Sequence, residues 1–159
     1  MGAISRRTWL KTASALATMA ASQEARANDR VVMGIMAIKD RGWDLALEFG
    51  MRDDVEIRYL ADPDSRLFDE RAQKLEQTKG KRPQCVQDFR RMLDGKEVDA
   101  IAIATPDHWH ARMVIDAVDA GKDVYIEKPM SHTIPDGFAM VKAVRNTKRI
   151  VHVGTQRRS

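Results

Sequence analysis

The chain has 159 residues, of which 43% are hydrophobic and 31% charged, with 27 Lys and Arg against 23 Asp and Glu and a net charge of +4. This composition is typical of a globular domain and excludes a disordered or collagen-like chain. Residues 1–27 hold four basic residues and one acidic residue, so the rest of the chain has a net charge of only +1. A basic surface for nucleic acid is therefore not expected.

Residues 1–27 have the parts of an export signal in the expected order. SRRTWLK at residues 5–11 precedes a weakly apolar stretch at 12–22 and an A-x-A cleavage site at 25–27. Paired arginines followed by a bulky apolar residue and lysine resemble the bacterial twin-arginine signal. We expect export to the periplasm by the twin-arginine machinery and a mature chain that starts at Asn28; the alternative is a disordered or amphipathic basic tail. The apolar stretch is about half the roughly 20 residues that span a bilayer, so no membrane span is expected.

Residues 28–159 alternate between short apolar runs and longer amphipathic ones, which predicts a βαβα order. In chain order, the pattern predicts strand 31–37, helix 43–51, strand 55–61, helix 65–79 capped by Ser65, and a turn at 79–83. It then predicts a short strand at 85–86, helix 88–93, strand 98–104, helix 107–120 stopped by Gly121, strand 124–127, helix 134–146 and strand 150–154.

Strands joined by helices predict a mostly parallel sheet with helices on both faces, because a tight turn cannot close a parallel pair. The expected fold is therefore α/β, a doubly wound and Rossmann-like sheet in a single domain over residues 28–159. Ligands of such sheets bind beyond the carboxyl ends of the strands. The residues that follow each strand are the ones to examine for function.

The first strand-to-helix turn reads AIKDRG at residues 37–42. Against the dinucleotide pattern G-x-G-x-x-G it keeps only Gly42, with Ala37 and Lys39 at the other two glycine positions. Lys39 hinders a close approach to a pyrophosphate but offers a compensating charge, whereas Asp40 would repel phosphate. Ala37, Lys39, Arg41 and Gly42 are the candidate cofactor contacts here, but this loop alone leaves open whether a dinucleotide binds.

The second predicted strand gives firmer support for a dinucleotide. Asp62 lies about 20 residues after Gly42, where an acidic side chain accepts hydrogen bonds from the adenosine ribose. An aspartate there favours NAD over NADP, although Arg66 is close enough in sequence to hold a 2′-phosphate, so NADP remains an alternative. The segment 62–65 also has the residues of a turn and a helix cap, which is compatible with cofactor binding.

Two later segments carry a family resemblance. The segments are ATPDHWH at residues 104–110 and AGKDVYIEKP at 120–129. They resemble the T-P-[ND]-x-x-H turn and the A-G-K-x-V-x-x-E-K-P strand end of the Gfo/Idh/MocA family, which includes glucose-fructose oxidoreductase and inositol dehydrogenase. VGTQRR at 153–158 is similar to the sixth strand and exit of that family, so the resemblance covers residues 31–159.

The resemblance implies an NAD(P)-binding domain of an oxidoreductase acting on a sugar or polyol. It places Thr105, Pro106 and His110 on the nicotinamide side of the cofactor, and Glu127, Lys128 and Pro129 at the edge where substrate meets it. Lys128 is the expected catalytic residue, since an ammonium group can polarise a hydroxyl or carbonyl and pass a proton during hydride transfer. No metal site is expected, because histidines two residues apart do not face each other on a helix.

Family members continue into a second domain that covers the substrate, whereas this sequence stops at Ser159. We therefore expect a truncated or partial chain that can hold a cofactor but lacks a complete active site. Two alternatives stay open. One is the N-terminal part of an NAD-dependent glycoside hydrolase, and the other is a binding-only or inactive remnant whose altered loop has lost the cofactor. The substrate and the oligomeric state are not predicted.

Overall fold

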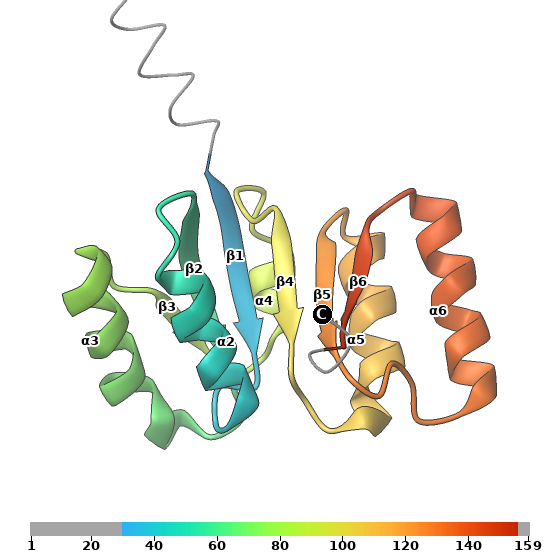
Figure 1. The fold of residues 1–159 in the computed structure, drawn as a ribbon, viewed down its shortest axis with the longest axis horizontal. Helices are drawn as coiled ribbons and strands as arrows, with labels where there is room; N and C mark the ends of the chain where they lie inside the picture. The colour runs from blue at the N-terminus through green and yellow to red at the C-terminus, as the bar shows by residue number, and fades with distance from the viewer. Residues whose placement is uncertain (1–29, 156–159) are drawn as a thin grey trace, which may run out of the picture. The chain divides into compact units, whose positions relative to one another are not determined.

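A computed structural model describes residues 30–155, and the predicted export signal lies outside these residues. The described chain forms one six-stranded sheet in the order β3-β2-β1-β4-β5-β6, in which every neighbouring pair is parallel (Figure 1). The strands are β1 (Val31–Met36), β2 (Val55–Ala61), β3 (Gln84–Val86), β4 (Ala100–Ile103), β5 (Asp123–Glu127) and β6 (Val151–Gly154). This is the strand order of a doubly wound nucleotide-binding sheet, so the predicted fold is confirmed.

The helices divide between the two faces of the sheet. They are α2 (Arg41–Gly50), α3 (Phe68–Lys79), α4 (Arg90–Leu93), α5 (Asp107–Asp119) and α6 (Ile134–Thr147), and a 3₁₀ turn (Ser65–Leu67) precedes α3. The α2 and α3 helices cover one face beside β1 and β2, whereas α4, α5 and α6 cover the other (Figure 1). Crossovers between parallel strands are right-handed. From β1 the chain adds strands toward β3, and from β4 it adds strands toward β6. Because these directions are opposite, the connecting helices lie on opposite faces.

A buried core lies on each face because strand side chains alternate. On β4, Ile101 and Ile103 pack with α5 and α6, whereas Ala102 between them packs on the α2 side. All three side chains are fully buried. Burying an isoleucine side chain contributes about 2 to 3 kcal/mol, so these short apolar strands stabilise the sheet that positions the loops.

The turn after β2 differs from the prediction that Ser65 caps the next helix, and that prediction is wrong. The side chain of Asp64 accepts the Arg66 N–H at 3.1 Å and forms the cap, and Ser65 is the first residue of the 3₁₀ turn. Asp64 is fixed there because its own N–H donates to Asp62 Oδ1 at 2.9 Å. Gly121 follows α5 with a φ of 77°, in agreement with the predicted stop.

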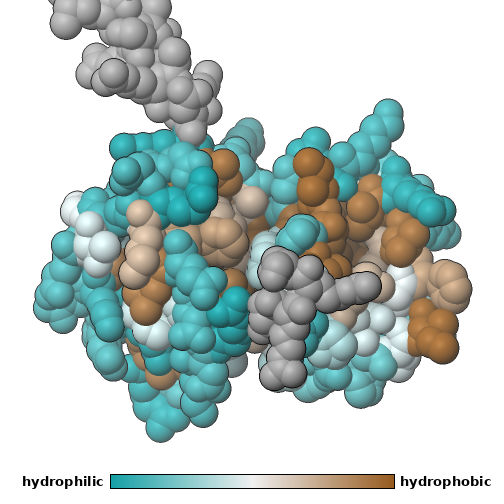
Figure 2. Space-filling model, in the orientation of Figure 1, coloured by the Kyte–Doolittle hydropathy of each residue, from teal (hydrophilic) through white to brown (hydrophobic). Residues whose placement is uncertain are grey.

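The face that carries α2 and α3 has no helix over β5 and β6 among the described residues. In Figure 2, apolar side chains are exposed in this part of the view. Ile150, just before β6, is 70% exposed. None of the helices in the described part of the chain has the length and apolar character needed to cross a membrane.

Candidate functional site

A cleft of about 890 Å³ lies at the carboxyl edge of the sheet. It opens between the loops that follow β1, β2 and β4, beside the point where the strand order reverses. Cofactors of doubly wound sheets bind at such a point. The residues predicted from the sequence that line this cleft are Ala37, Lys39, Arg41, Asp62, Thr105 and Pro106.

The loop after β1 keeps the shape of a glycine-rich turn despite its substitutions. Ala37 adopts a left-handed conformation with φ of 63°, which glycine adopts without strain and alanine with some. Gly42 lies in the first turn of α2, where a side-chain carbon would overlap the carbonyl of Ala37. Lys39 and Asp40 line the cleft at the start of α2. The positive end of this helix dipole therefore lies beside the cleft, a favourable place for a pyrophosphate.

Asp62 at the end of β2 is 7% exposed and lines the cleft. Its Oδ2 accepts the Ile38 N–H at 2.9 Å, and its Oδ1 accepts the Asp64 N–H at 2.9 Å. Each oxygen uses one of its two lone pairs in these bonds, so each can still accept a hydroxyl from a ligand. The same two bonds join the loops after β1 and β2, so Asp62 also shapes the cleft.

The loop after β4 brings a hydroxyl and an indole to the cleft. Thr105 Oγ1 is buried and makes no hydrogen bond with any residue between 30 and 155, although it is in a wall of the cleft. Buried hydroxyls in native proteins are normally paired, whereas this one has no partner among the described residues. Trp109, in the first turn of α5, lines the same wall and is 45% exposed.

His110 lies beneath this loop and does not line the cleft, since it is 1% exposed. Its Nδ1 is 2.7 Å from the Pro129 carbonyl oxygen and its Nε2 is 2.9 Å from the Thr105 carbonyl oxygen. Both partners are carbonyl oxygens, and a ring nitrogen that carries a hydrogen donates to its partner. His110 therefore ties the loop after β4 to the turn after β5.

Glu127 at the end of β5 is buried and forms an ion pair with the first loop. Arg41 Nε donates to Glu127 Oε1 at 2.8 Å, and Arg41 also pairs with Glu48 on α2 at 2.9 Å. The hydrogen bond to Glu127 raises the pKa of the Arg41 guanidinium above its ordinary value. Glu127 Oε2 accepts the Lys128 N–H at 3.3 Å. Lys128 and Pro129, which are joined by a cis peptide bond, are exposed, and none of Glu127, Lys128 and Pro129 lines the cleft.

Sequence reasoning missed part of the lining of the cleft. The missed residues are Pro63 after β2, Gln87, Asp88 and Phe89 between β3 and α4, Arg90 at the start of α4, and Met113 on α5. The turn after β3 contains no known motif, so only its place at the carboxyl edge of a strand could have indicated it. Between residues 30 and 155, no group of three His, Cys, Asp or Glu side chains is placed to hold a metal ion.

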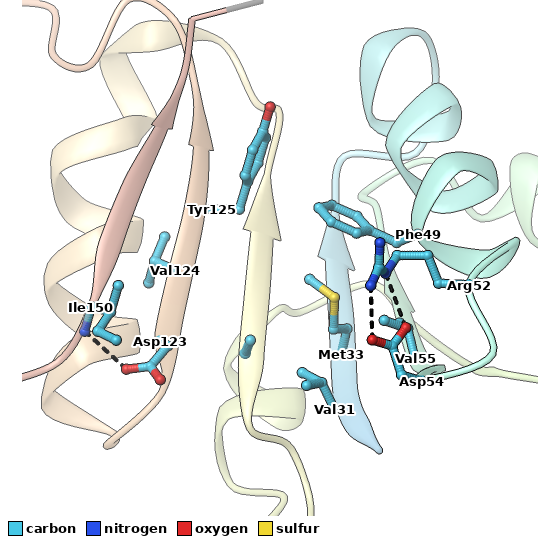
Figure 3. A pocket seen from close by; sticks show the side chains of 11 residues that line it. Val31, Met33, Phe49, Arg52, Asp54, Val55, Asp123, Val124, Tyr125 and Ile150 are labelled. Atoms are coloured by element: carbon cyan, nitrogen blue, oxygen red, sulfur yellow. Dashed lines mark hydrogen bonds and ion pairs between the residues drawn. The ribbon is translucent and has the colours of Figure 1, made fainter. Parts of the chain in front are cut away.

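A second hollow of about 350 Å³ lies at the opposite edge, at the amino ends of β1, β2 and β4 (Figure 3). Its lining is mostly apolar, and its polar groups bond to one another. Arg52 pairs with Asp54 at 2.8 Å, and the Ile150 N–H donates to Asp123 at 2.9 Å. Polar groups that are already satisfied offer little to orient a polar ligand. The cleft at the carboxyl edge is therefore the candidate functional site.

Comparison with known proteins agrees with this geometry. Residues 31–155 match the Gfo/Idh/MocA family model, described as an oxidoreductase family with an NAD-binding Rossmann fold. The fold resembles that of scyllo-inositol dehydrogenase from Lactobacillus casei, solved with NAD(H) and scyllo-inositol, with a TM-score of 0.73 and 20% identity over 81% of this chain and 37% of that one. Myo-inositol 2-dehydrogenase from Lactobacillus plantarum has a TM-score of 0.70 and 23% identity over the same shares of the two chains.

The curated relatives include a glycosyl hydrolase family 109 protein of Shewanella pealeana, 27% identical over 125 residues, which are 76% of this chain. An alpha-N-acetylgalactosaminidase of Shewanella oneidensis is 24% identical over 123 residues, or 75% of this chain. The matched part spans 27% of the length of each relative. Because the family model covers most of the chain, and the fold and cleft agree with it, this protein belongs to the Gfo/Idh/MocA oxidoreductase family and comprises its NAD-binding Rossmann domain.

Proposed function

We propose that this chain is the cofactor-binding part of an NAD-dependent oxidoreductase that acts on a sugar or polyol. The observation that carries the proposal is the cleft at the carboxyl edge, which the start of α2, Asp62 and Thr105 line together, and the Thr105 hydroxyl has no hydrogen-bond partner among residues 30–155. An anionic pyrophosphate fits the helix start, ribose hydroxyls fit Asp62, and a carboxamide fits Thr105.

Bound NAD would supply the hydride acceptor, and the side chains of this chain would bind, orient and move a proton. Lys128 is exposed and follows immediately after the buried Glu127, which pairs with Arg41 of the cleft lining. Its ammonium can donate a hydrogen bond to a substrate hydroxyl, and its neutral amine can accept the proton that this hydroxyl loses as it is oxidised. The Arg41–Glu127 pair and the His110 bonds fix the turn from which Lys128 projects.

We expect Thr105→Val to weaken NADH binding about fivefold, because valine matches the shape of threonine but removes one hydrogen bond worth about 1 kcal/mol. Thr105→Ser, which keeps the hydroxyl, is the matched control and should bind nearly as well as the unaltered chain. The measurement is titration of residues 28–159 with NADH, followed by the fluorescence of Trp109 in the cleft. Without nucleotide, Thr105→Val should be no less stable to urea, since the hydroxyl has no hydrogen-bond partner among residues 30–155.

Absence of saturable binding at millimolar NADH would contradict cofactor binding by this chain and favour an inactive remnant. Equal NADH affinity of Thr105→Val and the unaltered chain would instead show that the hydroxyl does not contact the cofactor.

A second candidate is the cofactor domain of an NAD-dependent glycoside hydrolase, which the two Shewanella relatives favour. Such an enzyme oxidises the sugar transiently to loosen a glycosidic bond and reduces it again, so NAD is regenerated. The two functions therefore differ in their products. An oxidoreductase forms one NADH for each oxidised sugar, whereas the hydrolase releases a free sugar with no net change in NAD. A product assay on the longer protein distinguishes them.

We also propose that residues 1–27 direct export through the twin-arginine route to the periplasm. Arg6 and Arg7 and the Ala-Arg-Ala sequence before Asn28 support the proposal. We expect Edman sequencing of the protein from the periplasmic fraction to begin at Asn28, and replacement of both arginines by lysine to abolish that fraction. Periplasmic protein that still begins at Met1 would contradict cleavage, and export of the lysine variant would contradict the twin-arginine route.

A further inference from the structure

The end of β2 carries an ion pair that the proposed site does not yet use. Two residues after Asp62, the Asp64 carboxylate binds the Arg66 guanidinium through two bonds, Nε to Oδ1 at 2.8 Å and Nη2 to Oδ2 at 2.7 Å. Asp64 Oδ1 also accepts the Arg66 N–H at 3.1 Å. A two-bond contact of this kind uses the side of the guanidinium that would otherwise grip a phosphate.

This pair contributes little to the stability of the fold. The Arg66 side chain is 88% exposed and that of Asp64 is 34% exposed. Exposed ion pairs are weakly stabilising because water and salt screen them. The hydrogen bonds from Arg66 nevertheless lower the pKa of Asp64 to about 2. Asp64 is therefore a full negative charge at any pH near neutrality, and it neutralises Arg66.

The pair stands beside the part of the cleft that suits the adenosine ribose. Asp62 and Pro63 line that part, and Lys39 of the facing loop is close enough to Asp64 to lower its pKa as well. The two oxygens of Asp62 each accept a backbone N–H, which partly compensates its charge. Among residues 30–155, Asp64 accepts a backbone N–H only from Arg66 of its own turn, so Arg66 compensates most of its charge.

We infer that Asp64 is a specificity-determining residue that excludes NADP by holding Arg66 in an ion pair. The inference rests on the proposed binding of NAD. A 2′-phosphate placed beyond Asp62 would meet the Asp64 carboxylate and find the Arg66 guanidinium occupied. NAD has a hydroxyl at that position and meets neither obstacle. Discrimination between NAD and NADP then depends on repulsion by the Asp64 carboxylate as much as on the contacts of Asp62.

Asp64→Ser tests the inference, because serine can still cap the 3₁₀ turn while the carboxylate is lost. Residues 28–159 would be titrated with NADH and with NADPH. The unaltered chain should bind NADH at least about tenfold more tightly. In Asp64→Ser, Arg66 is released, so NADPH affinity should rise about tenfold or more, while NADH affinity changes less than about threefold. The gain for NADPH should weaken as salt is raised.

The double variant Asp64→Ser with Arg66→Ser is the matched control and should lose the gain in NADPH affinity. Arg66→Ser alone should bind NADPH no better than the unaltered chain, because the carboxylate remains. Urea unfolding of all variants checks that the turn is intact. Saturable NADH binding with an unchanged NADPH to NADH ratio in Asp64→Ser, or a gain that persists in the double variant, overturns this inference alone. Failure of the unaltered chain to bind either nucleotide overturns the proposed function and this inference with it.

Discussion

Gly42→Ala is expected to lower the free energy of unfolding by about 3 kcal/mol. The added carbon would overlap the carbonyl of Ala37 and would lie 3.2 Å from the side chain of Ala104. A backbone carbonyl at the start of a buried helix cannot move aside as a flexible side chain can. The first loop and α2 must therefore separate, and the α2 end of the cleft widens.

Urea unfolding followed by circular dichroism measures this effect, and Gly80→Ala is the matched control. Gly80 follows α3 with a φ of 71° and has open space around it. Its substitution should lower stability by only about 1 kcal/mol, the cost of an alanine in the left-handed region. If Gly42→Ala loses no more stability than Gly80→Ala, the close approach of α2 to the first loop does not require glycine at position 42.

Arg41→Ala is expected to lower the free energy of unfolding by about 2 kcal/mol, because it leaves the buried Glu127 carboxylate without its ion-pair partner. The loss is smaller than for a fully buried pair, since the Arg41 side chain is 32% exposed and water can partly replace it. Glu127→Gln should lose less, because a neutral amide needs no counter-charge. Differential scanning calorimetry or urea unfolding gives the values.

The double variant Arg41→Ala with Glu127→Gln isolates the interaction. If the pair acts as described, the double variant should be more stable than the sum of the two single losses predicts, by at least about 1 kcal/mol. Strictly additive losses would mean that Arg41 acts through Glu48 or through packing. The same comparison reports on the turn that carries Lys128, whose N–H bonds to Glu127.

Periodicity was sufficient to predict the βαβα order and the edge of the sheet at which ligands bind. Apolar runs such as that of β4 and amphipathic runs such as that of α5 depend on local patterns, and local patterns are visible in a sequence. The ends of elements were less accurate, since they depend on single hydrogen bonds. The cap at Asp64 is an example, because its place is set by the bond from its N–H to Asp62.

The parts of the site that could not be predicted are those formed by contacts between residues that are distant in sequence. Arg41 and Glu127 are 86 residues apart, and only the placement of β5 in the sheet brings them together. The turn between β3 and α4 forms a wall of the cleft because β3 is the edge strand beside β2. His110 shows the same limit. Its motif was visible, but its place beneath the loop follows from the face of α5 that is buried.

The pattern G-x-G-x-x-G has glycine at its first and last positions for two different reasons, and the first loop of this chain meets these two demands with different residues. Its opening position needs a left-handed backbone, which Ala37 adopts at a cost of about 1 to 2 kcal/mol. Its closing position needs empty space, which no residue other than glycine can leave. An alanine meets the first demand at a cost in energy, whereas at the second any side-chain carbon overlaps the carbonyl of Ala37. Searches that weight the three glycines equally would therefore overlook dinucleotide domains of this kind, and a search anchored on the last glycine would recover them.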